Sequence, residues 1–149
     1  MKGCLLLLAP GILLVTGRPG AEDANRKDLE KLQGDWQAAS MVIDGMPLPD
    51  DDAQAMFRTV KGNQYTVSHF RKQLGRGTFT IDAKASPKRI DARPDGPAGK
   101  AGPVLGIYEI EGARFRVCFA LQGKERPTDF SAKKGSGHTL TVWEREKSK

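Results

Sequence analysis

The feature that most constrains this chain is a series of about eight short β-type runs, joined by tight turns and by no helix long enough to link parallel strands. Apolar and polar residues alternate along these runs, most clearly from Arg114 to Leu121. Turn signals such as Gly62-Asn63 and Glu111-Gly112-Ala113 separate neighbouring runs. The pattern predicts an all-β fold, an antiparallel meander of about eight strands.

An antiparallel meander of this length has two arrangements available to it. Eight strands can close into a barrel that is filled by side chains or holds one small ligand. Closure also removes the exposed sheet edges, which otherwise invite aggregation. A two-sheet sandwich is the alternative. We therefore predict a closed barrel.

A short helix is expected before the first strand, over residues Asn25 to Gln33. Asn25 or Asp28 can cap this helix, and Gly34 can end it. Because Leu29 and Leu32 share one face of this helix, we expect it to lie over one end of the sheet as a lid or plug.

Two later connections are expected to lie outside the sheet. Pro47 and Pro49 exclude their neighbours from a ladder, and Asp50-Asp51-Asp52-Ala53 can begin one helical turn. The segment from Asp95 to Pro103 holds three glycines and two prolines, and is expected to be the longest flexible connection.

The first residues, 1–21, have the pattern of a secretory signal peptide. An apolar run from Leu5 to Val15 follows Lys2, and residues 16–21 are small and polar. The run is shorter than the roughly 20 residues of a membrane-spanning helix. Cleavage after Gly17 or Ala21 would leave one domain, residues 22–149, without a transmembrane segment, and an uncleaved anchor is the alternative. The predicted location is periplasmic or extracellular.

Charge and cysteine content narrow the partners of this domain. Loss of two bases, Lys2 and Arg18, lowers the formal charge from +6 to +4, with both signs interspersed. The remaining bases form no stripe interleaved with aromatic residues, so a nucleic-acid partner is not predicted. Only Cys118 remains of two cysteines, which excludes an internal disulfide.

Six stretches of the domain carry a resemblance to a known family. They are Leu32-Gln33-Gly34-Asp35-Trp36, Asp44-Gly45-Met46-Pro47-Leu48-Pro49, Val60-Lys61-Gly62-Asn63-Gln64-Tyr65-Thr66-Val67, Gly77-Thr78-Phe79-Thr80-Ile81-Asp82, Gly106-Ile107-Tyr108-Glu109-Ile110 and Gly123-Lys124-Glu125-Arg126-Pro127-Thr128-Asp129-Phe130. On these motifs, residues 32–146 resemble a planctomycete-type secreted domain of uncharacterised function, regarded as lipocalin-like. The resemblance implies a lipocalin-like barrel in an exported protein, and it implies no activity.

The opening Gly34-x-Trp36 also resembles the start of lipocalins in general. That resemblance implies that an Arg from a late strand packs over the Trp, and Arg145 is the candidate here. Such a contact is worth about 0.5–2 kcal/mol. The disulfide and C-terminal helix of larger lipocalins have no counterpart in this sequence.

No catalytic or metal motif stands out, so we predict no enzyme activity, no cofactor and no metal site. Ser136 lies between glycines but precedes a strand, whereas a nucleophile elbow leads into a helix. Asp50-Asp51-Asp52 lacks the alternating ligands of a calcium loop. Of the two histidines, His69 and His138, the first fits a hydrogen-bonded core position; a carboxylate beside it would instead favour an enzyme.

The leading hypothesis is therefore an exported barrel that binds a small apolar or amphipathic molecule. Trp36 is interpreted as a structural plug at the barrel base or, alternatively, as a wall of the ligand pocket. The sequence leaves open which strand faces point inward. The further candidate ligand-binding residues are Tyr65, His69, Phe79, Tyr108, Phe115 and Phe119.

The alternative hypothesis is a protein-interaction or cell-envelope structural domain with a solid core and an envelope protein as partner. Its candidate contacts are Lys124, Arg126 and Asp129, in a loop that either braces the barrel or recognises the partner. Cys118 is either a covered thiol or one made reactive by neighbouring arginines.

Overall fold

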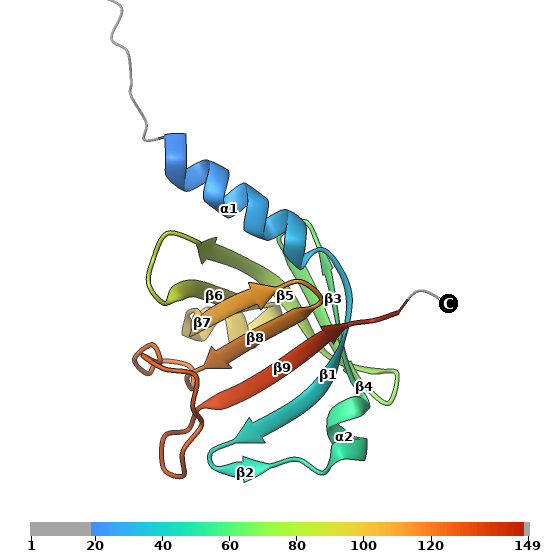
Figure 1. The fold of residues 1–149 in the computed structure, drawn as a ribbon. Coiled ribbons are helices and arrows are strands. Elements are labelled where there is room, and N and C mark those ends of the chain that lie inside the picture. Colours follow the sequence, from blue (N-terminus) through green and yellow to red (C-terminus); the bar gives the residue numbers. More distant parts are fainter. Residues whose placement is uncertain (1–18, 148–149) are drawn as a thin grey trace, which may run out of the picture.

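Nine strands follow one another around a single antiparallel sheet in the computed structural model, which describes residues 19–147 (Figure 1). They are β1 (Gly34–Ile43), β2 (Met46–Pro47), β3 (Met56–Lys61), β4 (Gln64–His69), β5 (Lys72–Asp82), β6 (Lys88–Pro94), β7 (Val104–Glu111), β8 (Arg114–Phe119) and β9 (Thr139–Arg145). β9 pairs with β1, so eight strands close a barrel and β2 is an extra strand beside β1. The predicted all-β barrel is confirmed, and the sandwich is excluded.

The register between strands decides which faces point inward. Phe115 of β8 lies opposite Trp143 of β9, and both are buried, whereas Arg114 on the other face of β8 is exposed. The same alternation places Arg58 of β3 and Phe79 of β5 inside the barrel. Apolar residues of every long strand thus meet in one interior.

Helix α1 (Pro19–Leu32) lies across one end of the barrel, at the top of Figure 1. Leu32 enters the core, and the buried Asp28 carboxylate holds the helix to the wall. Its Oδ2 accepts hydrogen bonds from the Tyr108 hydroxyl at 2.8 Å and from Lys88 Nζ at 2.6 Å. The predicted lid is confirmed.

The expected start and caps of this helix are wrong. The helix begins at Pro19, which places Asn25 and Asp28 within it. Their side chains serve tertiary contacts instead, since Asn25 Oδ1 accepts from the Ala83 N–H at 2.8 Å and Asp28 binds the barrel wall. Most of the expected signal peptide, residues 1–18, lies outside the described residues, and cleavage after Ala21 would remove the first three residues of α1.

Arg145 joins the end of β9 to the end of α1. Its guanidinium carbon lies 4.2 Å from the centroid of the Trp36 ring, which confirms the expected contact. Nη1 donates to the Gln33 carbonyl and Nη2 to the Lys31 carbonyl, both at 2.6 Å. One side chain therefore satisfies carbonyls at the helix C-terminus while it covers the indole.

Gly34 makes this junction between helix and strand sterically feasible. Its φ of +105° is a conformation that favours glycine, and a Cβ there would lie 3.2 Å from Arg145 Nη1. Directly after this turn, Trp36 Nε1 donates to the Leu32 carbonyl at 2.9 Å. The Gly34-x-Trp36 spacing thus places the indole against both the helix end and the guanidinium.

The connections differ from expectation in two places. Helix α2 (Asp50–Gln54) is the expected helical turn, but Pro47 does join the sheet, since it pairs in β2 with Val42 of β1. This is feasible because β2 is a two-residue strand at the margin of the sheet. The expected flexible connection contains a 3₁₀ helix, η1 (Gly96–Ala101), which Gln122 Nε2 binds through the Ala98 and Gly102 carbonyls.

Replacing Arg145 with Ala should lower the free energy of unfolding by about 1–3 kcal/mol, because the cation–π contact and two hydrogen bonds to carbonyls are lost. Urea denaturation followed by Trp fluorescence measures the change. Arg114→Ala is the control, because this side chain is 65% exposed and its ion pair with Glu144 is long, at 3.8 Å. Its loss should change the free energy of unfolding by less than about 0.5 kcal/mol. Equal effects of the two substitutions would contradict the role given to Arg145.

Candidate ligand-binding site

The half of the barrel beneath α1 is filled by aromatic side chains. The rings of Trp36 and Phe115 meet edge to face with centroids 5.7 Å apart, and those of Tyr108 and Phe115 meet at 6.4 Å. All three are at most 1% exposed, and Phe79 is also buried. Four of the sequence-predicted ligand residues thus form the packed core, in agreement with the interpretation of Trp36 as a structural plug.

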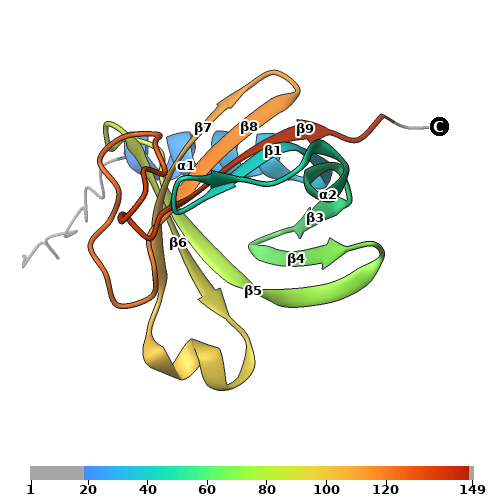
Figure 2. The same cartoon turned by 90° about the horizontal axis from the view of Figure 1, so that it is seen from below.

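The other half of the barrel contains a cavity of about 300 Å³, which opens at the end away from α1; Figure 2 views the barrel from this end. Its wall is predominantly apolar, and no Asp or Glu contributes to it. Two of the predicted ligand residues, Tyr65 and Phe119, line it. The full lining is Met41, Met56, Arg58, Tyr65, Val67, Ala92, Val104, Val117, Phe119, Ala120, Thr139, Thr141 and Trp143.

Arg58 is the one charged residue in this lining, and it is only 5% exposed. Its guanidinium carbon lies 4.8 Å from the centroid of the Tyr65 ring and about 6 Å from those of Phe79 and Phe115. Burial lowers the pKa of Arg58 to about 10, so the side chain remains positively charged at neutral pH. The cavity therefore combines an apolar wall with a single cation.

His69 shares a strand face with Tyr65 but does not line the cavity. It pairs across the sheet with Met56, and its ring centroid lies 4.4 Å from that of Phe70. Its Nε2 is buried without a hydrogen-bond partner among the described residues, rather than bonded as expected. Within residues 19–147, no carboxylate bonds to His69.

Sequence reasoning missed Arg58, although a signal for it exists. Arg58 occupies the same alternating face of its run as Met56 and Val60. A charged residue between two apolar ones on one face marks either a solvated face or a buried charge, and only the register of β3 shows which.

The candidate interaction loop braces the barrel from outside. Arg126 Nη1 donates to the Gly106 carbonyl at 2.7 Å and lies 2.6 Å from Asp91 Oδ1, an ion pair without hydrogen-bond alignment. Asp129 accepts from the Ser131 hydroxyl at 2.5 Å, and Lys124 is exposed. Of the three residues, Arg126 is thus bonded to the barrel wall, whereas Lys124 and Asp129 are exposed.

The same loop covers the Cys118 thiol. Cys118 is buried, and its Sγ donates weakly to the Ser131 carbonyl at 3.4 Å. Burial, with a smaller contribution from Asp129, raises the pKa of the thiol to about 11. The structure therefore favours the covered thiol over the reactive one.

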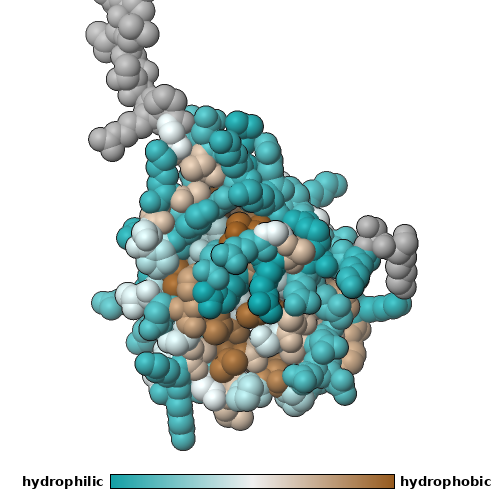
Figure 3. Space-filling view, in the orientation of Figure 1, coloured by the Kyte–Doolittle hydropathy of each residue, from teal (hydrophilic) through white to brown (hydrophobic). Residues whose placement is uncertain are grey.

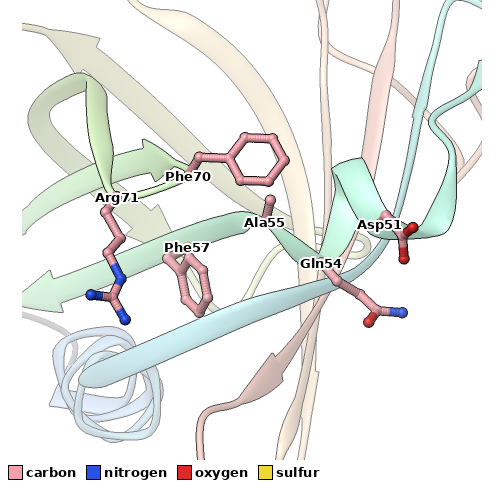
Figure 4. Close-up of a pocket in the computed structure, with 6 residues that line it drawn as sticks. All are labelled: Asp51, Gln54, Ala55, Phe57, Phe70 and Arg71. Carbon is pink, nitrogen blue, oxygen red and sulfur yellow. The ribbon is translucent and has the colours of Figure 1, made fainter.

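A second hollow lies on the outer wall, beside α2 and the turn after β4 (Figure 4). It measures about 530 Å³ but is widely open to solvent. In Figure 4 the ring of Phe70 lies beside Ala55, while Gln54 and Asp51 point away from it. Because no polar groups converge there, the barrel cavity is the better candidate for a binding site.

Comparisons with protein-family models, curated proteins and solved structures find no match for this chain. Within residues 19–147, no three His, Cys, Asp or Glu side chains gather as a metal site would require. None of the helices in that range has the length and apolar character needed to cross a membrane.

Native Cys118 should react with a disulfide reagent at pH 8 about two orders of magnitude more slowly than the unfolded chain, because both access and thiolate fraction are reduced. The rate can be followed spectrophotometrically in a Cys4→Ser background. Ser40→Cys combined with Cys118→Ser supplies an exposed thiol on the same barrel as the control. If Cys118 and the control thiol at position 40 react at comparable rates in the folded proteins, the loop does not protect Cys118.

Proposed function

We propose that this protein is an exported, non-enzymatic barrel that binds one small apolar or amphipathic molecule in the open half of its interior. The cavity of about 300 Å³ carries this proposal. Its volume matches the lower end of the roughly 300–1,000 Å³ range of small-molecule sites. Its lining also has the usual character of such sites, mainly apolar with few polar groups.

Exposed apolar side chains around the open end support the proposal. The large hydrophobic residues that are exposed all belong to strand ends or turns at that end: Ile43, Met46, Phe70, Leu74 and Leu121. In the space-filling view, the surface of α1 is mainly hydrophilic, whereas hydrophobic residues gather lower on the same face of the molecule (Figure 3). None of the five lines the cavity itself, but they make the surface at the same end of the barrel more apolar.

Export and family remain part of the same proposal. The leader-like composition of residues 1–21 supports secretion to the periplasm or the extracellular space. The motifs shared with planctomycete-type secreted domains, and the lipocalin-like contact between Arg145 and Trp36, support the same assignment.

The second candidate function, recognition of an envelope protein, is favoured by the same exposed residues. Met46 is 74% exposed and Phe70 is 66% exposed, and both lie at the open end of the barrel. In this version the open end would contact the partner. The loop that contains Arg126 would remain a brace, because that guanidinium already bonds the barrel wall.

Ala92→Phe should weaken binding of a small hydrophobic fluorescent probe, such as N-phenylnaphthylamine, at least about tenfold, because the added ring occupies the cavity. Ala92 is buried in the lining, whereas Thr80 is exposed on the outside, so Thr80→Phe is the matched control. Native mass spectrometry should also detect a bound mass in gently purified wild-type protein that Ala92→Phe lacks.

Retention of probe affinity by a folded Ala92→Phe variant would exclude the barrel interior as the binding site. Circular dichroism and the urea midpoint establish that the variant is folded. If the probe is instead lost from a variant with Met46 and Phe70 both changed to Ser, the outer surface of the open end is the binding site.

A further inference from the structure

Arg58 is a buried cation without a counter-charge. Among residues 19–147 it forms no ion pair and donates no hydrogen bond, and its Nε is buried without a partner. Charged groups in protein interiors are ordinarily paired, because removing a charge from water without compensation is costly. The rings that surround Arg58 supply no counter-charge, so a negatively charged partner in the cavity would compensate for its burial.

The aromatic rings around Arg58 stabilise the cation only in part. The Tyr65 ring, at 4.8 Å, is near enough for a cation–π contact, and Phe79 and Phe115 lie at the limit of such contacts. These contacts use the π faces of the rings and supply no hydrogen-bond acceptor. Nε is covered by protein atoms, whereas the terminal nitrogens Nη1 and Nη2 are not, so these two remain available to an acceptor in the cavity.

Few other polar groups accompany Arg58 in the cavity wall. Trp143 also lines the cavity, but its Nε1 is covered by protein atoms and has no acceptor among the described residues. The hydroxyls of Thr139 and Thr141 are the other side-chain polar groups of the lining besides the Tyr65 hydroxyl. The residues that line the cavity thus supply one positive charge and three hydroxyl groups, and no negative charge.

From this arrangement we infer that the cavity selects a small amphipathic carboxylate, whose head group binds Arg58 and whose apolar chain extends toward the open end. The inference rests on the proposed binding function. Carboxylate oxygens match the planar donor fork of a guanidinium, and one carboxylate neutralises one cation. Met41, Met56 and Phe119 would then contact the chain. A phosphate with close to two charges would bring more charge than this wall can neutralise.

Decanoate and decanol are the matched probes, because they differ only in the head group. The wild-type protein should bind decanoate at least about tenfold more tightly than decanol, as charge-assisted hydrogen bonds exceed neutral ones. Isothermal titration calorimetry measures both affinities, and quenching of Trp fluorescence provides a second readout.

Arg58→Met should reduce decanoate affinity at least about tenfold while decanol binding is retained. Arg93→Met is the control, since this exposed arginine on β6 carries the same charge outside the barrel. Arg58→Lys, which keeps the charge but loses the fork, should give an intermediate affinity for decanoate. Equal loss in Arg58→Met and Arg93→Met would overturn the inference in favour of a general electrostatic effect.

The carboxylate inference can also be tested on the wild-type protein, so the test does not require that the Arg58 variants fold. The Arg58 Nε–H resonance, followed by ¹⁵N NMR, should shift on addition of decanoate and remain in place with decanol. Equal affinity for the two probes would overturn the carboxylate inference and leave the binding function standing. If neither decanoate nor decanol binds, and the Ala92→Phe variant still binds the fluorescent probe, both the carboxylate inference and the proposed binding function are overturned.

Discussion

The pairing of β9 with β1 is the constraint on which the rest of this structure depends. It joins the first and last strands, so the sheet has an interior instead of two faces. It also places Arg145 opposite Trp36, where the guanidinium contacts both the indole and the end of α1. Without this closure, Arg58 would lie on a solvated sheet face, and the apolar residues around it would be exposed to water.

The closed barrel has two unlike ends because the chain fills only one of them. Beneath α1, large rings and Leu32 pack together, and the Asp28 carboxylate bonds both Tyr108 and Lys88. Burial and the hydrogen bond to Asp28 raise the pKa of Tyr108, so its hydroxyl remains a proton donor over the physiological range. Toward the other end, smaller residues such as Ala92 and Ala120 contribute to the wall and leave volume unfilled. The cavity therefore exists because the side chains that point inward are smaller at the open end than beneath α1.

Alternation of apolar residues predicted nearly every strand, because each is short, bounded by turns and buried on one face. The pattern failed where tertiary contacts overrode local preference, as for Asn25 and Asp28, whose cap-like side chains lie within a helix. It also could not separate packed from lining positions: Phe115 and Phe119 share one face of one strand, yet only Phe119 borders the cavity. That difference depends on depth along the barrel axis, which the period of a strand does not encode. Arg58 was missed for a related reason, since its burial follows from closure by strands distant in sequence.

The position of α1 has a consequence for the orientation of the protein in its surroundings. The helix starts at Pro19 at the closed end, so any segment preceding it joins the barrel on the side opposite the cavity entrance (Figure 1). If the protein were held at a surface through its N-terminal side, its entrance would face away from that surface, toward the surrounding fluid. In that arrangement exchange of ligand would take place with dissolved molecules or with a facing surface.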